Sequence, residues 1–395
     1  MKKLFTRFQE IVLLVSGWFT SIMVLLIVFF LFKEGIKIFG KKPVEEGFVM
    51  AVHPNNLVNS ISPGMCKDIF DGKIENWERL GGRSYPIELA TLEDIGSLYT
   101  EEEIGSEMEH LDSCFNDYIN KHEGALISLP KSAVSSSFKG KIISVKKISL
   151  NSFIRGIEWF PTSKPVAQFG ILPLITGTLL VSLGAILFAL PLGLACAIYM
   201  AEITNKRTRS FMKPIVELLA GIPSVVYGFF GLVVIVPLIQ KVFHLDVGET
   251  ALSGSIILGI MALPTIITIS EDALRNVPVS MREASIALGA TKWQTISKVL
   301  IPYSLNGITT AIALGIGRAI GETMAVLMVT GNAGNLTLSY LKPIRTIPAT
   351  IAAELGEAPA GGMHYQALFT LGCVLFVFTL AINIYINFVT KRRRM

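Results

Sequence analysis

The sequence is poor in charge and in the side chains that enzyme active sites use most. Only 16% of its 395 residues are charged, whereas a typical soluble domain has about 25%. Its five His are scattered in the sequence, which favours solvated side chains, and its four Cys lack metal-ligand spacing. It contains no Walker A glycine loop, no H-E-x-x-H and no G-x-S-x-G motif. We therefore expect no catalytic residues, no metal site and no cofactor in this chain.

Long apolar runs are present instead. Hydrophobic residues make up 51% of the chain, and the mean hydropathy is +0.56. A helix needs about 20 mainly apolar residues to cross the hydrocarbon core of a bilayer. Such windows occur near 11–32, 169–201, 212–240, 250–270, 303–331 and 365–389. The sequence predicts an all-α polytopic membrane protein with six transmembrane helices.

The first window follows the basic segment MKKLFTRFQE. It is too long for a removable signal peptide and has no small-residue cleavage site. We therefore expect a retained N-terminal transmembrane helix over residues 1–33.

The positions of Lys and Arg predict the orientation, because cationic loops tend to stay in the cytoplasm. With the N-terminus inside, fifteen cationic residues fall in cytoplasmic flanks, and four lie on the other side outside the long insert between the first two windows. The fifteen are Lys2, Lys3, Arg7, Lys206, Arg207, Arg209, Lys213, Arg275, Arg282, Lys292, Lys298, Lys391, Arg392, Arg393 and Arg394. We predict a multi-pass protein of the inner (cytoplasmic) membrane with both termini cytoplasmic.

Residues 34–165 form a hydrophilic insert that this orientation places outside. The insert has 15 Lys and Arg against 19 Asp and Glu, whereas the rest of the chain has 20 against 11. Its length permits a small domain with its own core. Turn formers alternate with apolar runs at 58–82 and 124–134, and Ser62-Pro63 is a good helix start, so we expect an α+β domain. No basic patch with interleaved aromatics indicates a nucleic-acid partner.

The cysteines leave one question open. Cys66 and Cys114 lie in the insert and could form a disulfide in an oxidising compartment, but two buried thiols are the alternative. Cys196 and Cys373 lie in apolar windows, where Cys acts as a small apolar residue.

The cytoplasmic stretch EDALRNVPVSMREASIALGATKWQTISKVLIP, residues 271–302, predicts two short helices joined by a glycine turn. Two capping-box patterns, each of which satisfies backbone donors at a helix N-terminus, flank a glycine suited to a left-handed turn, and a proline follows as a stop. These residues are Ser280 with Glu283, Thr291 with Gln294, Gly289 and Pro302.

The apolar residues of this stretch have helical spacing. They are Ala284, Ala287, Leu288, Trp293, Ile296 and Leu300. One interpretation is a docking helix for a cytosolic protein, and the other is a helical loop on the bilayer surface. Glu283 in turn is either a contact residue or only a helix cap.

The same stretch resembles the EAA loop of ABC importer permeases, which reads E-A-A, three residues, G, nine residues, I-x-L-P. Here the chain has Glu283-Ala284-Ser285, three residues, Gly289, nine residues, then Val299-Leu300-Ile301-Pro302. The departures are Ser285, Val299 and Ile301. The resemblance implies that Glu283, Ala284 and Gly289 couple the chain to an ATPase.

Three further stretches resemble the PstC-like permeases of phosphate importers: GIPSVVYGFFGL (221–232), GRAIGETMAVLMVTGN (317–332) and RTIPATIAAELGEA (345–358). The resemblance covers residues 165–395 and implies a type I ABC importer permease fold, with a permease core over 166–395. The partners it implies are a second, PstA-like permease subunit, cytosolic PstB-like ATPase subunits, a periplasmic or extracellular phosphate-binding protein, inorganic phosphate and membrane lipid.

Parts of the insert are similar to phosphate-binding proteins, namely DIFDGKIENWERLGG (68–82) and GALISLPKSAV (124–134). The Ser- and Gly-rich phosphate-cradling loop of that family is absent, and the acidic ATLEDIGSLYTEEEIG (90–105) stands in its place. We therefore interpret the insert as a degenerate lobe of a binding-protein fold that assists or replaces docking of a separate binding protein.

Two opposite charges, Arg318 and Glu322, lie in the fifth apolar window with Thr323 beside them. Charges inside a span usually face a cavity or pair with each other, and a spacing of four residues permits an ion pair on one helical face. One interpretation is a structural salt bridge. The other is an anion pathway in which Glu322 holds and partly neutralises the guanidinium of Arg318.

Together these features predict the permease subunit of an ABC importer for inorganic phosphate, working by alternating access. Arg318, Glu322 and Thr323 are the predicted pathway residues. The alternative is a membrane-anchored anion receptor or sensor that uses the outward lobe, although neither an intact pocket motif nor a cytoplasmic output domain is recognisable.

Overall fold

The computed structural model describes residues 2–105, 110–135 and 137–392. The chain separates into two compact units. One comprises Met1–Ile36 with Leu172–Met395, and the other is Lys37–Ile171. We call them the membrane unit and the insert unit.

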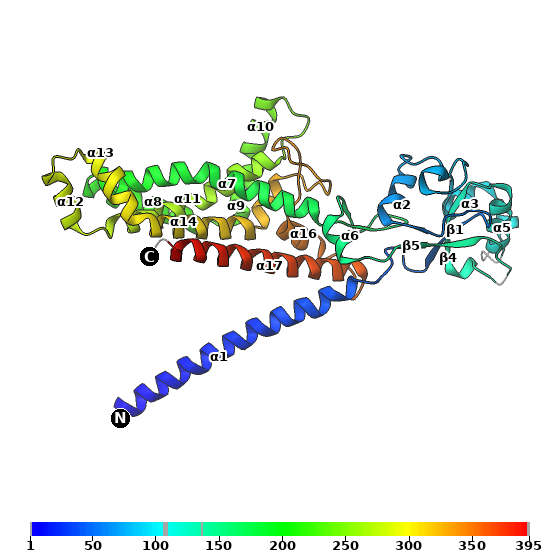
Figure 1. Ribbon diagram of the computed structural model, residues 1–395, viewed down its shortest axis with the longest axis horizontal. Coiled ribbons are helices and arrows are strands. Elements are labelled where there is room, and N and C mark those ends of the chain that lie inside the picture. The colour runs from blue at the N-terminus through cyan, green and yellow to red at the C-terminus, as the bar shows by residue number, and fades with distance from the viewer. Residues whose placement is uncertain (1, 106–109, 136, 393–395) are drawn as a thin grey trace. The chain divides into compact units, whose positions relative to one another are not determined.

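The membrane unit is helical (Figure 1). Within the part of the chain that the structure describes, six helical segments are long and apolar enough to cross a membrane, which confirms the predicted polytopic all-α architecture. The helices are α1 (Lys2–Gly35), α7 (Leu172–Ile198), α8 (Lys206–Gly221), α9 (Ser224–Phe230), α10 (Val236–Phe243), α11 (Ala251–Arg275), α12 (Val279–Ala287), α13 (Lys292–Thr295), α14 (Ile301–Gly321), α15 (Met324–Val329), α16 (Ile347–Glu354) and α17 (Met363–Arg392).

The third span begins later than predicted. The helix α8 is a separate element whose N-terminus is capped by Asn205, and the span itself covers Ser224–Phe243. The chain breaks before Pro223 because a residue that precedes proline is driven out of the helical region, and Ile222 is extended, with φ −70° and ψ 128°.

Pro302 does not end a helix, contrary to the prediction. A π-helical turn over Ile296–Leu300 joins α13 to α14, so that one helix runs from Lys292 to Gly321. In that turn the Ile301 N–H donates to the Ile296 carbonyl, five residues back. The wider turn directly before the proline accommodates its ring and its missing N–H.

Small residues lie among larger apolar ones at the centre of the membrane unit, where α11 packs against α7 and α14. A methyl group on Gly184 of α7 would lie 2.4 Å from the Ser255 hydroxyl oxygen of α11, so this contact requires glycine. Close approach of helices through small residues is a common way to hold a bundle together where lipid removes the hydrophobic driving force.

The C-terminal end of α1 packs on α17 (Figure 1). Phe30 contacts Phe369 edge-to-face at 5.5 Å between ring centroids, and the Thr370 hydroxyl donates to the Gly35 carbonyl at 2.8 Å. Over residues 10–30, α1 exposes most of its apolar side chains, as Leu13 and Trp18 illustrate. The contact with α17 joins the N-terminal helix to the other helices of the membrane unit.

The insert unit is an α+β fold. Its main sheet has the order β2-β5-β1-β4-β3, in which β1 is antiparallel to β4 and β5, while the β2–β5 and β3–β4 pairs are parallel. The strands are β1 (Phe48–Val52), β2 (Ser60–Ile61), β3 (Glu88–Ala90), β4 (Ala125–Pro130) and β5 (Lys141–Val145), with a small hairpin of β6 (Trp159–Phe160) and β7 (Gln168–Phe169). The helices are α2 (Pro63–Phe70), α3 (Leu92–Leu98), α4 (Glu101–Ile104), α5 (Leu111–Lys121) and α6 (Leu150–Arg155).

The helix start predicted at Ser62-Pro63 is confirmed, because the Ser62 hydroxyl accepts the Met65 N–H. The two stretches that resemble binding proteins also meet in space. The indole N–H of Trp77, from 68–82, donates to the Gly124 carbonyl, from 124–134, at 2.9 Å. Trp77 is fully buried, so this bond joins the two stretches inside the core.

The sheet separates two apolar cores, and this decides the cysteine question. Met50 and Val52 of β1 point into one core with Cys66, whereas Ala51 points to the other face with Cys114. Both thiols are free, and burial raises the pKa of Cys66 to about 12. The possible disulfide does not form because the two cysteines lie on opposite faces of the sheet.

Candidate functional site

The predicted ion pair between Arg318 and Glu322 is wrong. The helix α14 ends at Gly321, and Glu322 is extended, with φ −72° and ψ 135°, so it no longer lies one turn above Arg318. Among the described residues, no hydrogen bond or ion pair joins the two side chains. A Glu322 carboxylate oxygen instead lies 3.4 Å from the Ala325 N–H, at the start of α15. The acid therefore caps the next helix, where a carboxylate is favoured.

Arg318 is consequently a cation without a recorded partner. It lies in the last turn of α14, where a positive charge is favoured by the helix dipole, and it is partly exposed. The described residues include no hydrogen-bond or ion-pair partner for its guanidinium. A lone arginine in an apolar span requires water, an anion or another chain to offset its cost.

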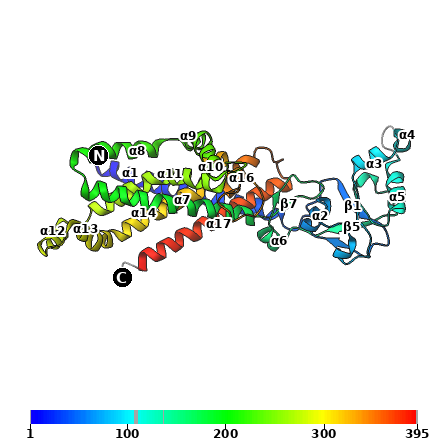
Figure 2. The ribbon, with the colours of Figure 1, turned by 90° about the horizontal axis from the view of Figure 1, so that it is seen from above.

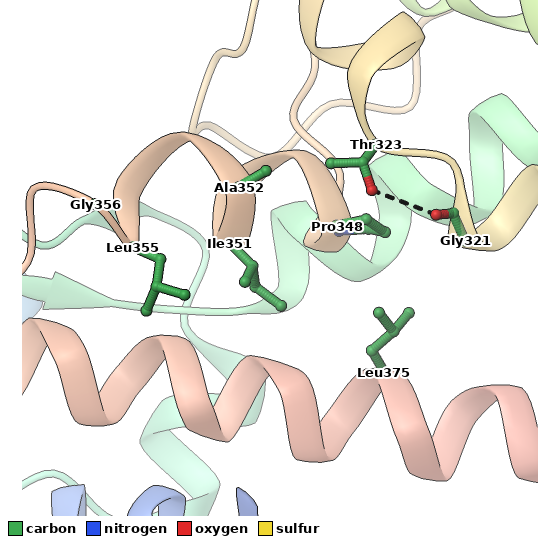
Figure 3. A pocket seen from close by; sticks show the side chains of 8 residues that line it. All are labelled: Gly321, Thr323, Pro348, Ile351, Ala352, Leu355, Gly356 and Leu375. Carbon is green, nitrogen blue, oxygen red and sulfur yellow. Dashed lines mark hydrogen bonds between the residues drawn. The ribbon is translucent and has the colours of Figure 1, made fainter. Parts of the chain in front are cut away.

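A cavity of about 510 Å³ opens beside the break between α14 and α15 (Figure 3). Residues from α16, from α17 and from the break itself line it. They are Gly321, Thr323, Pro348, Ile351, Ala352, Leu355, Gly356 and Leu375. Of the three predicted pathway residues, Thr323 alone lines this cavity. Its hydroxyl oxygen lies 3.4 Å from the Gly321 carbonyl and is the main polar side-chain group that the cavity offers.

A charged cluster near this cavity was missed by the sequence analysis. The Glu354 carboxylate of α16 accepts from Arg345 and, at 2.8 Å, from Nε2 of His364 on α17. Arg345 also donates from Nε to the Asn332 carbonyl at 2.8 Å. His364 was expected to be solvated, but its side chain is 14% exposed. No periodic spacing relates these residues, so only the fold brings them together.

The stretch 271–302 forms the two predicted short helices, with one correction. The helix α12 begins at Val279 after Pro278 and has no side-chain cap, so the predicted Ser280–Glu283 capping box is wrong. The reason is that Pro278 starts the helix early and places Ser280 inside its first turn. The second capping box, Thr291 with Gln294, is confirmed.

Gly289 takes the left-handed conformation that the turn requires, with φ +82°. A residue with a Cβ would be strained there, although nothing lies within 4 Å of the added atom. Glycine is thus needed for the backbone at this position rather than for space.

The predicted apolar residues of this stretch separate into an outer and an inner set. Leu288 is 88% and Trp293 is 63% exposed, whereas Ile296 and Leu300 are buried against the ends of α7 and α11. Glu283, Ala284 and Gly289 are all exposed beside the outer set. The outer set forms an apolar surface with one acidic residue, at the end of the bundle that carries α12 and α13 in both Figure 1 and Figure 2. We call this surface the coupling surface.

A buried carboxylate lies near this end of the bundle. Glu271 of α11 is 1% exposed and pairs with Arg209 of α8 at 2.6 Å and with Lys213 at 3.4 Å. In the sequence these two cations indicated only the orientation of the loop. The ion pairs show that they also tie α8 to α11.

In the insert unit, the acidic stretch 90–105 is used for local structure. The Asp94 carboxylate accepts the Thr91 N–H at the start of α3, and the Glu103 carboxylate accepts the Thr100 N–H. These carboxylates occupy helix N-termini, which are otherwise sites where a free anion can bind. The stretch 90–105 therefore caps helices and does not form a phosphate-binding loop.

Comparisons with known proteins agree on one family. Residues 189–395 match the family model described as the inner membrane component of binding-protein-dependent transport systems. The chain is 39% identical over 275 residues to the probable ABC transporter permease protein YqgH of Bacillus subtilis, covering 69% of this chain and 89% of that protein. It is also 39% identical over 250 residues to the phosphate transport system permease protein PstC of Mesorhizobium japonicum, covering 58% and 75% respectively.

Among solved structures, the inward-facing MetNI methionine ABC transporter is similar at a TM-score of 0.43 and 19% identity. The similarity covers 57% of this chain and 94% of that chain. The family match begins after the insert unit ends.

Proposed function

The chain belongs to the family of inner membrane components of binding-protein-dependent transport systems, and on that premise we propose that it is the PstC-like permease subunit of an ABC importer for inorganic phosphate. It is a multi-pass membrane protein that depends on other chains for ATP hydrolysis. Its proposed partners are a second, PstA-like permease, PstB-like ATPase subunits and a phosphate-binding protein.

The observation that supports a pathway role most strongly is the unpartnered guanidinium of Arg318. A planar donor of this kind suits phosphate oxygens. Glu322 is not paired with Arg318, so it does not neutralise the arginine in this state. Weak attraction can instead come from the partial exposure of Arg318 to water. Thr323, at the mouth of the cavity, supplies a neutral hydroxyl.

The coupling surface supports the proposed ATPase contact. Glu283 has no capping role, and its charged side chain is exposed beside the apolar Leu288 and Trp293. An exposed apolar patch with polar residues at its rim is typical of a protein interface. The adjoining Ala284 and Gly289 allow close approach. We propose that ATP binding and hydrolysis in the partner move α12 and α13, and that the spans then alternate between outward and inward access.

The basic flanks support a topology with both termini in the cytoplasm and the insert unit outside. We propose that the insert unit helps a separate binding protein to dock. Replacing residues 40–160 with a short linker tests this. Unchanged uptake with an unchanged requirement for the binding protein would contradict it.

Phosphate uptake by cells carrying Arg318→Ala tests the pathway proposal, with uptake divided by the amount of protein in the membrane. We expect a fall of roughly tenfold or more, as removal of about 1.4 kcal/mol of attraction produces. Arg318→Lys keeps the charge and should retain part of the activity. The exposed Arg207→Ala serves as the control. Normal uptake by a well-expressed Arg318→Ala protein would exclude the pathway role.

A further inference from the structure

The helix α12 has an inner face as well as the coupling surface. Ser285 is buried, and its hydroxyl lies 2.9 Å from the Thr295 hydroxyl of α13, which fixes the two short helices to each other. Arg282 lies three residues before Ser285, and therefore on the same side of the helix. The exposed Glu283 lies on the other side. A movement of α12 would therefore be passed to the rest of the chain through the contacts of this inner face.

Arg282 contacts two other helical elements. Its Nη2 atom lies 2.9 Å from Oε1 of Glu202, which belongs to the π-helical turn Tyr199–Ile203 that follows α7. The same nitrogen donates to the Leu274 carbonyl, at the C-terminal end of α11, at 2.9 Å. One side chain therefore joins α12 to the ends of two membrane helices.

The surroundings make this connection stiff. An apolar cluster fills the space where these elements meet, and it includes residues of α7, of α11 and of the π-helical turn that precedes α14. Its members are Ala197, Ile198, Leu274, Val277, Ile296 and Leu300. Packed side chains of this kind move together rather than deform, so a displacement of one element is passed to its neighbours.

The ion pair itself is incompletely satisfied. Glu202 is 10% exposed and Arg282 is 25% exposed at the side chain. Among the described residues, Nε of Arg282 is buried without a hydrogen-bonding partner, and Oε1 of Glu202 forms no well-aligned hydrogen bond although it lies 2.9 Å from Nη2 of Arg282. A buried pair of this geometry is weak evidence for stability, because apolar residues in its place would often be as stable. A rearrangement of the ion pair would let Nε of Arg282 and Oε1 of Glu202 form the hydrogen bonds that they lack here.

We propose that the Arg282–Glu202 ion pair is the link through which movement of α12 is passed to α7, and that the bond of Arg282 to Leu274 passes it to α11. This inference deepens the proposed function and rests on it. Arg282 and Glu202 are positioning residues: they act through the helices and do not contact the transported anion.

The test uses the full importer complex, reconstituted in vesicles, with ATP hydrolysis and phosphate uptake measured together. In Arg282→Gln and in Glu202→Gln we expect uptake for each ATP hydrolysed to fall roughly tenfold, within the usual range of coupling between sites. Hydrolysis itself should change by less than about twofold, because the coupling surface is intact. Exchange of the two residues, Arg282→Glu with Glu202→Arg, should restore part of the lost uptake.

The exposed Arg275→Gln, at the end of α11, controls for loss of one positive charge at this end of the bundle. An unchanged ratio of uptake to hydrolysis in both single variants overturns the inference, even if the amount of assembled complex falls. So does an exchange variant no better than the single ones. If the unaltered complex hydrolyses ATP but takes up no phosphate, the proposed function fails instead.

Discussion

The two units of this protein differ in where their large apolar side chains lie. In the insert unit the large side chains are inside, with Trp77, Phe115 and Trp159 fully buried. In the membrane unit many large side chains are exposed, as Leu187 at 66% and Phe229 at 61% illustrate, and glycine, alanine and serine lie among larger apolar side chains where the helices meet. Water drives the first arrangement, because burying apolar area is favourable. Lipid gives no such drive, so close approach and dispersion decide the second.

The largest expected effect of a substitution that tests this contrast is in the insert unit. Trp77→Ala removes a fully buried indole and its hydrogen bond to Gly124, so we expect the local unfolding free energy of the insert unit to fall by about 3–5 kcal/mol. Hydrogen–deuterium exchange of β4 in the full-length protein measures this. Leu98→Ala, at a side chain 63% exposed, is the control. Equal exchange rates in the two variants would mean that the insert unit does not depend on a buried core.

An intermediate effect is expected in the membrane unit from an added methyl group. A Cβ on Gly177 would lie 2.3 Å from the Arg345 carbonyl oxygen, which belongs to the backbone and cannot easily move. We expect Gly177→Ala to cost about 1–3 kcal/mol and to lower the melting temperature of the detergent-solubilised protein.

The matched control for this experiment is Leu187→Ala, which removes a large side chain from the outward face of α7. If the leucine substitution destabilises the protein more than the glycine substitution, then the membrane unit is held by large apolar side chains after all, and the contrast between the units fails.

The smallest effect is expected from lowering the pH, which protonates the surface carboxylate of Asp117 in the insert unit. Hydrogen bonds from Lys121 and from Tyr99 hold the pKa of Asp117 below its usual range. A lowered pKa in the folded state stabilises the fold above the unfolded pKa of about 3.9, and this contribution is lost as the pH falls through the folded pKa. Because the pair is exposed and screened, we expect less than about 1 kcal/mol.

Exchange of α5 amides between pH 6 and pH 3 measures that contribution, with Asp117→Asn as the reference. The difference between the two proteins should shrink as the pH falls from 6 to 3. A difference that stays constant over this range would show that Asp117 acts through packing and not through its charge.

The sequence predicted local structure well wherever that structure depends on residues within one helix or turn. The apolar windows located the spans, Gly289 located its turn, and Thr291 with Gln294 located a helix start. The errors arose where neighbouring residues modify an element. A π-helical turn lets the helix continue through Pro302. The helix α12 begins directly after Pro278, before the predicted capping residue Ser280.

For the candidate site, the sequence identified Arg318, Glu322 and Thr323 but not their partners, and it did not identify the cluster around Glu354. The contacts of Glu322 with α15 and of Glu354 with Arg345 depend on where helices end and which ends meet. Arg282, counted only as a cytoplasmic charge, proved to contact Glu202 and Leu274.

By itself the sequence determined that this chain crosses a membrane, how often, and where a separate hydrophilic unit interrupts it, because hydropathy and turn chemistry act over short distances. Only the tertiary structure decided which charges are paired, which cysteines can meet and which face of each helix is covered. Those outcomes depend on contacts between residues far apart in the chain, and no spacing along the chain encodes them.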